Sequence, residues 1–114
     1  LRTPADERSG ISLFDLETDS YVDLTDFGWL PEWTPDGRCL VFQGRLPGEA
    51  RDPEFPQNEG LLLLDVATGK ARDLLASPGA TLWFPGVSPD GRWVFFVEAT
   101  ARADIWMLQA DLPD

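Results

Sequence analysis

The sequence predicts an all-β fold made of antiparallel four-stranded blades, with about two and a quarter blades of a β-propeller that form a partial ring. Two internal repeats predict this fold, together with short runs of β-branched and aromatic residues that follow turn signals. No long stretch of the chain shows convincing helical periodicity, so the sequence favours strands over helices.

The two repeats occur in the same order along the chain. The first relates residues 29–38 to residues 83–92, in which six of ten positions are identical. The second relates residues 10–25 to residues 60–75, which share glycine, leucine, aspartate and threonine at equivalent places. This order indicates a repeated supersecondary unit, and each match has the pattern of a β-hairpin.

Each copy of the first repeat ends in the same Pro-Asp-Gly-Arg sequence. Proline presets the first turn angle, aspartate accepts hydrogen bonds from the backbone ahead of it, and glycine adopts a positive φ. We therefore expect tight turns that join two strands, and in the second repeat we expect Asp15 and Asp65 to cap the turns in the same way. The residues predicted to build the tight turns are Pro35, Asp36, Gly37, Pro89, Asp90 and Gly91.

We expect the whole chain, 1–114, to be one propeller fragment with a partial blade at 10–25, a full blade at 29–75 and a partial blade at 83–110. Pro31 and Pro85 fall in the first strand of a blade. Because a proline in a central strand loses a ladder hydrogen bond, this strand is expected at the inner edge of the blade. The expected strands are 11–16, 21–25, 29–34, 39–43, 61–66, 71–75, 83–88, 93–98 and 104–110.

The charge balance and the missing residue types exclude several classes of function. Twenty acidic residues against nine basic ones give a net charge of −11, which argues against nucleic acid and anionic lipid as partners. The chain has no histidine, which removes Ser-His-Asp catalysis and most zinc sites. No apolar run approaches the length of a membrane span. We expect no enzyme activity, catalytic residue, cofactor, metal or direct membrane insertion.

Local motifs that resemble chemical sites lack the partners that the chemistry needs. The tripeptide 26–28 matches a kinase metal-binding motif, but the only lysine, Lys70, lies after it. Asp52, Glu54 and Glu59 lack the spacing of a calcium loop. The tryptophans recur in repeat register and are expected to pack in the core or between blades: Trp29, Trp33, Trp83, Trp93 and Trp106.

The two faces of the expected blades differ in the length of their loops. One face carries only tight turns, whereas the other carries the segment 45–59, three times as long as its counterpart at 99–103. Long loops on a rigid scaffold are where binding sites usually lie, and a disordered surface insertion is the alternative. The candidate residues for binding a protein or peptide partner are Arg45, Glu49, Arg51, Asp52, Glu54 and Phe55.

The stretch 33–38, the apolar strand after it, and the later stretch 104–107 (Asp-Ile-Trp-Met) resemble the TolB-like, WD40-like (PD40) β-propeller repeat family. The resemblance covers about residues 10–110 and implies the propeller fold. Val87 departs from the family's pattern where a tryptophan is usual, and Gly10 and Gly60 stand in place of its aspartate.

The resemblance implies a non-catalytic module for protein or ligand binding or sensing in a larger bacterial protein. Such repeats form the C-terminal region of receptor-like serine/threonine kinases, or a periplasmic Tol-type protein, which favours an extracytoplasmic location over a cytoplasmic one. The alternative is the propeller lid of a prolyl-oligopeptidase-type serine peptidase. Fold analogy does not distinguish between them.

The remaining blades of the same propeller are an expected partner. The only methionine is Met107, so we expect a processed product or a piece of a longer protein. Strand counting leaves the last blade without its fourth strand, and we expect a strand from outside this chain to complete that blade. The strand at 104–110 would then present an open edge. We expect the 114-residue chain alone to oligomerise or aggregate.

Overall fold

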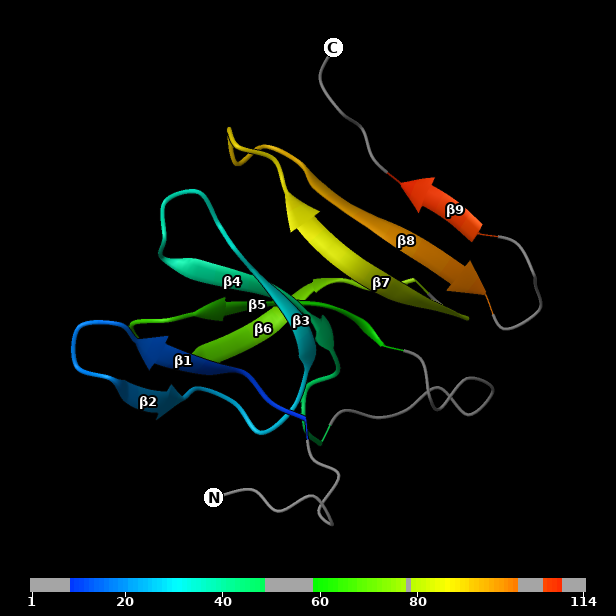
Figure 1. The fold of residues 1–114 in the computed structure, drawn as a ribbon. Coiled ribbons are helices and arrows are strands. Elements are labelled where there is room, and N and C mark those ends of the chain that lie inside the picture. Colours follow the sequence, from blue (N-terminus) through cyan, green and yellow to red (C-terminus); the bar gives the residue numbers. More distant parts are fainter. Residues whose placement is uncertain (1–8, 49–58, 78, 101–105, 110–114) are drawn as a thin grey trace.

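A computed structural model of the chain describes residues 9–48, 59–77, 79–100 and 106–109. The described residues form nine strands and no helix (Figure 1). In chain order the strands are β1 (Ser12–Asp15), β2 (Ser20–Asp23), β3 (Trp29–Trp33), β4 (Cys39–Gly44), β5 (Gly60–Asp65), β6 (Lys70–Leu75), β7 (Ala80–Val87), β8 (Val94–Thr100) and β9 (Trp106–Gln109).

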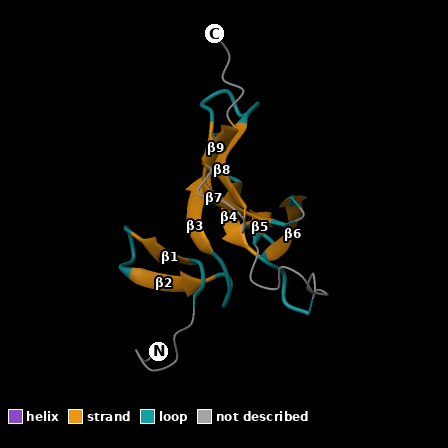
Figure 2. Cartoon of the chain, turned by 90° about the vertical axis from the view of Figure 1, so that its right-hand side faces the viewer, coloured by secondary structure: helices purple, strands orange, loops and turns teal. Residues whose placement is uncertain are grey.

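The strands form three antiparallel sheets in which neighbours along the chain are neighbours in space. Their orders are β1-β2, β3-β4-β5-β6 and β7-β8-β9. Figures 1 and 2 show the four-stranded sheet between the β1–β2 hairpin and the three-stranded sheet. This arrangement confirms the all-β fold with antiparallel, partial propeller blades.

The core lies where the four-stranded sheet is covered on both sides. One side of β4 and β5 packs on Ile11, which precedes β1. The other side lies against β7, whose Leu82 is fully buried. Because both faces of β4 and β5 are covered, these strands have a nearly continuous apolar sequence instead of an alternating one. The buried cluster on the Ile11 side consists of Ile11, Leu40, Phe42, Leu62 and Leu64.

The Pro-Asp-Gly-Arg turns have the same geometry in both sheets. The Asp36 carboxylate accepts hydrogen bonds from Thr34 Oγ1 at 2.6 Å and from the Arg38 N–H at 3.0 Å. These bonds, that from Thr34 first, hold the pKa of Asp36 below its ordinary value. Gly37 has a φ of 72°, which the glycine of such a turn needs.

The second turn repeats this pattern one sheet further along. The Asp90 carboxylate accepts bonds from Ser88 Oγ at 2.6 Å and from the Arg92 N–H at 3.0 Å, and Gly91 has a φ of 74°. The Ser88 bond is the larger cause of the lowered pKa of Asp90. In the other repeat, Asp15 and Asp65 each accept bonds from the two N–H groups at the start of their turns.

The largest difference from the expected strands is at β7. The sequence predicted that this strand begins at residue 83, whereas β7 begins at Ala80. Thr81 pairs with Ala99 and Leu82 pairs with Glu98, so β8 also extends further than expected. The reason is tertiary: Leu82 is buried against the neighbouring sheet, which fixes a segment that has no strand signal of its own.

Candidate functional site

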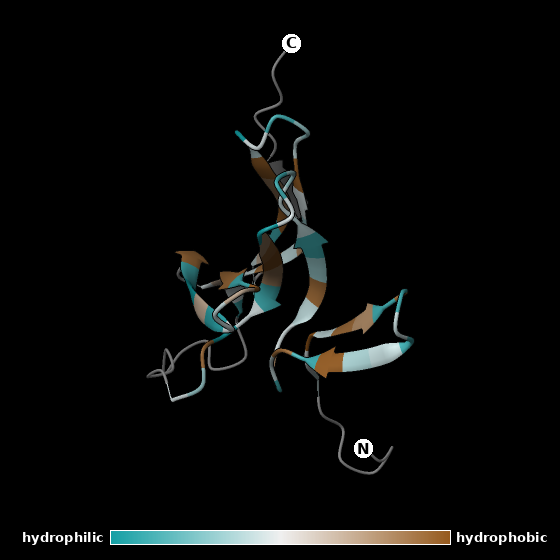
Figure 3. Cartoon of the chain, turned by 90° about the vertical axis from the view of Figure 1, so that its left-hand side faces the viewer, coloured by the Kyte–Doolittle hydropathy of each residue, from teal (hydrophilic) through white to brown (hydrophobic). Residues whose placement is uncertain are grey.

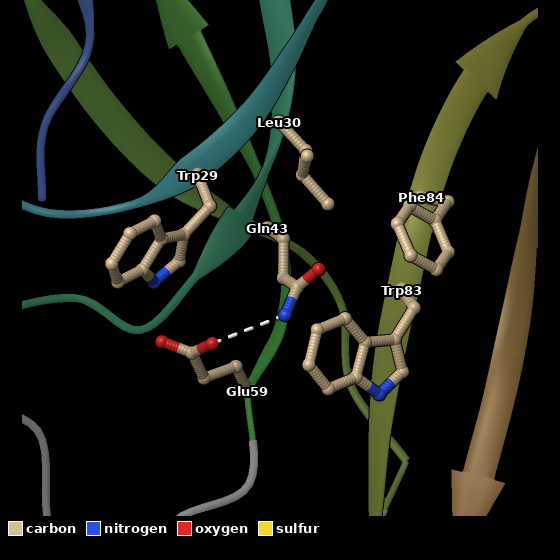
Figure 4. Close-up of a pocket in the computed structure, with 6 residues that line it drawn as sticks. All are labelled: Trp29, Leu30, Gln43, Glu59, Trp83 and Phe84. Carbon is tan, nitrogen blue, oxygen red and sulfur yellow. Dashed lines mark hydrogen bonds between the residues drawn. The ribbon is translucent and has the colours of Figure 1, made fainter.

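A pocket of about 440 Å³ lies between β3 and β7, the edge strands of two neighbouring sheets (Figure 4). Its walls are aromatic and aliphatic, with one amide and one carboxylate. Six residues line it: Trp29 and Leu30 from β3, Trp83 and Phe84 from β7, Gln43 from β4, and Glu59 just before β5.

Two β-bulges position the residues that form the apolar walls of the pocket. The pairing of β3 with β4 shifts register between Trp29 and Glu32, and the pairing of β7 with β8 shifts between Trp83 and Gly86. Within these bulges Leu30 has a φ of 55° and Phe84 a φ of 53°. A positive φ is uncommon for a bulky residue and costs about 1–2 kcal/mol.

The strained residues face the pocket and not the core. Leu30 is 39% exposed and Phe84 is 57% exposed, so burial does not compensate the strain. Pro31 and Pro85 follow them at the edge of each sheet, where the missing N–H costs no ladder bond. Strain of this kind collects at functional sites, and here it recurs at equivalent positions of two sheets.

The backbone of Glu59 is fixed by the next sheet. Its N–H donates to Thr81 Oγ1 at 3.3 Å, and its carbonyl accepts a bond from the Leu82 N–H at 2.9 Å. Its Oε1 accepts a bond from Gln43 Nε2 at 3.1 Å. The Glu59 backbone is therefore held by bonds to β7, and its carboxylate is held at the pocket by a bond from Gln43 on β4.

Gln43 supplies a buried acceptor that has no hydrogen-bond partner among the described residues. The residue is 1% exposed, lies opposite Trp29 in the strand register, and its Oε1 makes no hydrogen bond within the described part of the chain. The Glu59 carboxylate can only accept, so it fixes the amide with Nε2 toward Glu59 and Oε1 away from it. Figure 4 shows this oxygen directed to the side of the pocket where Trp83 and Phe84 lie. An unsatisfied buried acceptor costs about 1–3 kcal/mol, which a donor from a ligand would recover.

The loop predicted to bind a partner is described only at its two ends. Arg45 follows β4 and is half-buried. Glu49, Arg51, Asp52, Glu54 and Phe55 lie outside the described residues. Glu59, the last residue of the loop, lines the pocket.

The tryptophans expected to pack in the core or between blades include two that line the pocket. Trp29 is 50% exposed, and it stands with Trp83 at the pocket wall. One sequence signal could have located this site. Gln43 is polar at the end of an apolar strand, and the equivalent position in the other repeat is Val97. The positive φ angles of Leu30 and Phe84 carry no comparable signal, because both residues are bulky.

The described ranges contain no group of three or more histidine, cysteine, aspartate or glutamate side chains placed to hold a metal ion. Within the same ranges, no helix is long and apolar enough to cross a membrane. The six described residues that line the pocket provide aromatic faces, one carboxylate and one amide oxygen that has no partner within those ranges.

No protein-family model matches the chain, and no curated protein matches it either. Among solved structures, the crystal structure of TolB from Acinetobacter baumannii matches with a TM-score of 0.68 and 22% sequence identity. The match covers 91% of this chain and 24% of that chain, so the protein spans about a quarter of the TolB structure. The three sheets and this likeness together show that the chain has a TolB-like β-propeller fold.

Proposed function

We propose that the chain is a non-catalytic β-propeller module that binds a protein or peptide partner at the pocket between β3 and β7. The observation that carries this proposal is the buried Gln43 Oε1, which has no partner in the described part of the chain. It lies beside the Glu59 carboxylate and half-exposed aromatic side chains. Buried acceptors are normally satisfied, so this one favours a partner that brings a donor. The TolB-like fold supports a binding role, because such a scaffold holds its loops and edges rigidly.

We propose further that the repeats belong to the TolB-like, WD40-like (PD40) family and that the parent protein is bacterial. A receptor-like serine/threonine kinase or a periplasmic Tol-type protein fits a binding module of this kind, with an extracytoplasmic location. The remaining blades of the ring would come from the parent chain. The likeness to TolB supports this assignment through the fold.

The absence of catalysis in this proposal follows from the residues available. The chain has no histidine, and no serine, threonine or cysteine is among the residues that line the pocket. The carboxylates of Asp36 and Asp90 are engaged in their turns. Glu59 alone offers no pair of acid and nucleophile.

A peptide array tests the proposed function. The labelled 114-residue chain should bind a subset of peptides, and Trp29→Ala and Trp83→Ala should each weaken binding at least about tenfold, the range of an interface anchor. Tyr21→Ala is the matched control, because Tyr21 is an exposed aromatic residue on β2 outside the pocket. An array without any bound peptide, or binding that the tryptophan variants leave unchanged, would refute the proposed function.

A further inference from the structure

We infer that the pocket takes the guanidinium group of an arginine side chain from the partner polypeptide. This inference rests on the proposed function and narrows it to one chemical group. The pocket combines hydrogen-bond acceptors, negative charge and aromatic faces, and a guanidinium group satisfies all of them at once.

The polar atoms of the pocket select a donor. Gln43 Oε1 has no partner in the described part of the chain, and the Glu59 carboxylate accepts hydrogen bonds only. The Gln43 amide donates one hydrogen bond from Nε2 to the Glu59 carboxylate. None of the six described residues that line the pocket is basic, so none of these six neutralises the Glu59 carboxylate. An anionic ligand would meet like charge, whereas a cation with several N–H groups meets complementary partners.

The aromatic walls favour a flat cation. Trp29 and Trp83 stand on opposite sides of Gln43 in Figure 4, with Phe84 beside Trp83. Tryptophan is the strongest partner for a cation over a ring face, and arginine makes this contact more often than lysine. The planar guanidinium group stacks on such faces and carries five N–H donors in a fixed fork. A guanidinium group can therefore donate hydrogen bonds to acceptors on two elements at once, whereas the ammonium group of lysine is less suited to this.

The charge of the whole chain acts in the same direction. A net charge of −11 attracts basic segments of a partner before contact, and it disfavours acidic ones. The volume of about 440 Å³ leaves room for the aliphatic stem of arginine beside Leu30 and for flanking peptide backbone.

The test is a titration of the 114-residue chain with a capped Gly-Arg-Gly peptide, followed through the indole N–H signals in NMR spectra. Phenylalanine variants of single tryptophans assign these signals. The peptide with citrulline in place of arginine has nearly the same shape without the charge, and Gly-Lys-Gly has the charge without the planar fork. We expect the arginine peptide to shift the Trp29 and Trp83 signals and to bind at least about tenfold more tightly than the citrulline peptide.

Two variants locate the effect. Glu59→Gln should weaken arginine binding at least about fivefold and leave citrulline binding unchanged, because it removes only the charge. Gln43→Met removes the buried acceptor at similar volume and should also weaken binding. Glu17→Gln is the control, since it makes the same change in net charge in the exposed β1–β2 turn.

Each outcome decides the inference. Equal binding of the arginine and citrulline peptides, or equal binding of arginine and lysine, overturns it, and this comparison needs no variant that must fold. An equal loss in Glu17→Gln and Glu59→Gln shows general charge attraction and also overturns it. Peptides that bind at Trp29 and Trp83 without preference for arginine preserve the proposed function and remove this inference. A chain that binds no peptide on the array removes the proposed function itself.

Discussion

At the scale of single residues, three aspartates have lowered pKa values, and all three cap turns. Asp15 accepts bonds chiefly from the N–H groups of Glu17 and Thr18, while Asp36 and Asp90 accept them from a hydroxyl and an N–H. Since these bonds favour the ionised carboxylate, each lowers the pKa of its aspartate in the folded chain. Turn residues of this kind were readable from the sequence, because the bonds are local and depend on residue type.

The chain should therefore lose stability in acid. A group with a lowered folded pKa contributes stability that is complete above its unfolded pKa, about 3.9 for aspartate, and lost as the pH falls through the folded value. We expect the urea concentration at the unfolding midpoint to decrease when the pH is lowered below about 4. Replacing Asp15, Asp36 and Asp90 together by asparagine keeps an acceptor oxygen and should flatten this decline. A triple variant with the same pH dependence as the parent would contradict this account.

Gly37 isolates the cost of a positive φ. Its φ is 72°, and a Cβ added there would meet nothing within 4 Å, so the conformation alone decides the effect of a substitution. Gly37→Ala should lower the free energy of unfolding by about 1 kcal/mol, measured by urea denaturation. Gly37→Asn should cost less, because asparagine tolerates the left-handed region. Equal midpoints for the alanine variant and the parent would show that the turn relaxes freely.

At the scale of elements, the predicted strand order and its edge strands agree with the structure, because hydrophobic pattern and turn chemistry are local signals. What the sequence could not predict depends on contacts between sheets. The extra residues of β7 are held by burial of Leu82, and the bulges at Leu30 and Phe84 leave no trace in composition. The candidate site was missed for the same reason. It is formed where two sheets meet, whereas sequence reasoning placed binding in a single long loop.

We expect substitutions in the two bulges to change peptide binding more than the stability of the fold. Leu30→Gly removes an apolar wall of the pocket and also the strain of a φ of 55°. We expect it to weaken peptide binding while the free energy of unfolding changes by less than about 1 kcal/mol, since relief of strain offsets the lost contacts. Phe84→Gly should behave alike. Leu40→Ala, in the buried cluster, is the contrasting variant and should cost about 2–5 kcal/mol. A loss of that size in the glycine variants would show that the bulges are structural only.

At the scale of the whole molecule, the β1–β2 hairpin exposes apolar surface. Hydrophobic segments appear on the hairpin as well as in the central sheet (Figure 3). Phe14 and Tyr21 contact each other with ring centroids 5.0 Å apart, yet Tyr21 is 75% exposed. The hairpin is anchored by Ile11, which is buried in the core of the next sheet, and by Leu13 and Leu24, which pack against the same cluster. Exposed apolar surface next to open sheet edges favours association between chains.

The chain should consequently self-associate at micromolar concentration, as sedimentation velocity can measure. Leu16 is 85% exposed in the hairpin turn, so replacing it disturbs no pairing. Both Leu16→Glu and Leu16→Lys should reduce association, because each removes apolar surface although they change the net charge in opposite directions. A parent chain that sediments as a monomer would refute this prediction, and a reduction in the glutamate variant alone would point to charge repulsion instead.

The bonds that β7 makes to the backbone of Glu59 have a consequence for engineering. A loop usually places its own last residue, so a change in its length moves that residue. Here the position of Glu59 is also set by the neighbouring sheet, because Thr81 and Leu82 of β7 form hydrogen bonds with its backbone. We therefore expect that the segment between Leu46 and Glu59 can be shortened, lengthened or exchanged while the Glu59 backbone keeps its bonds to β7.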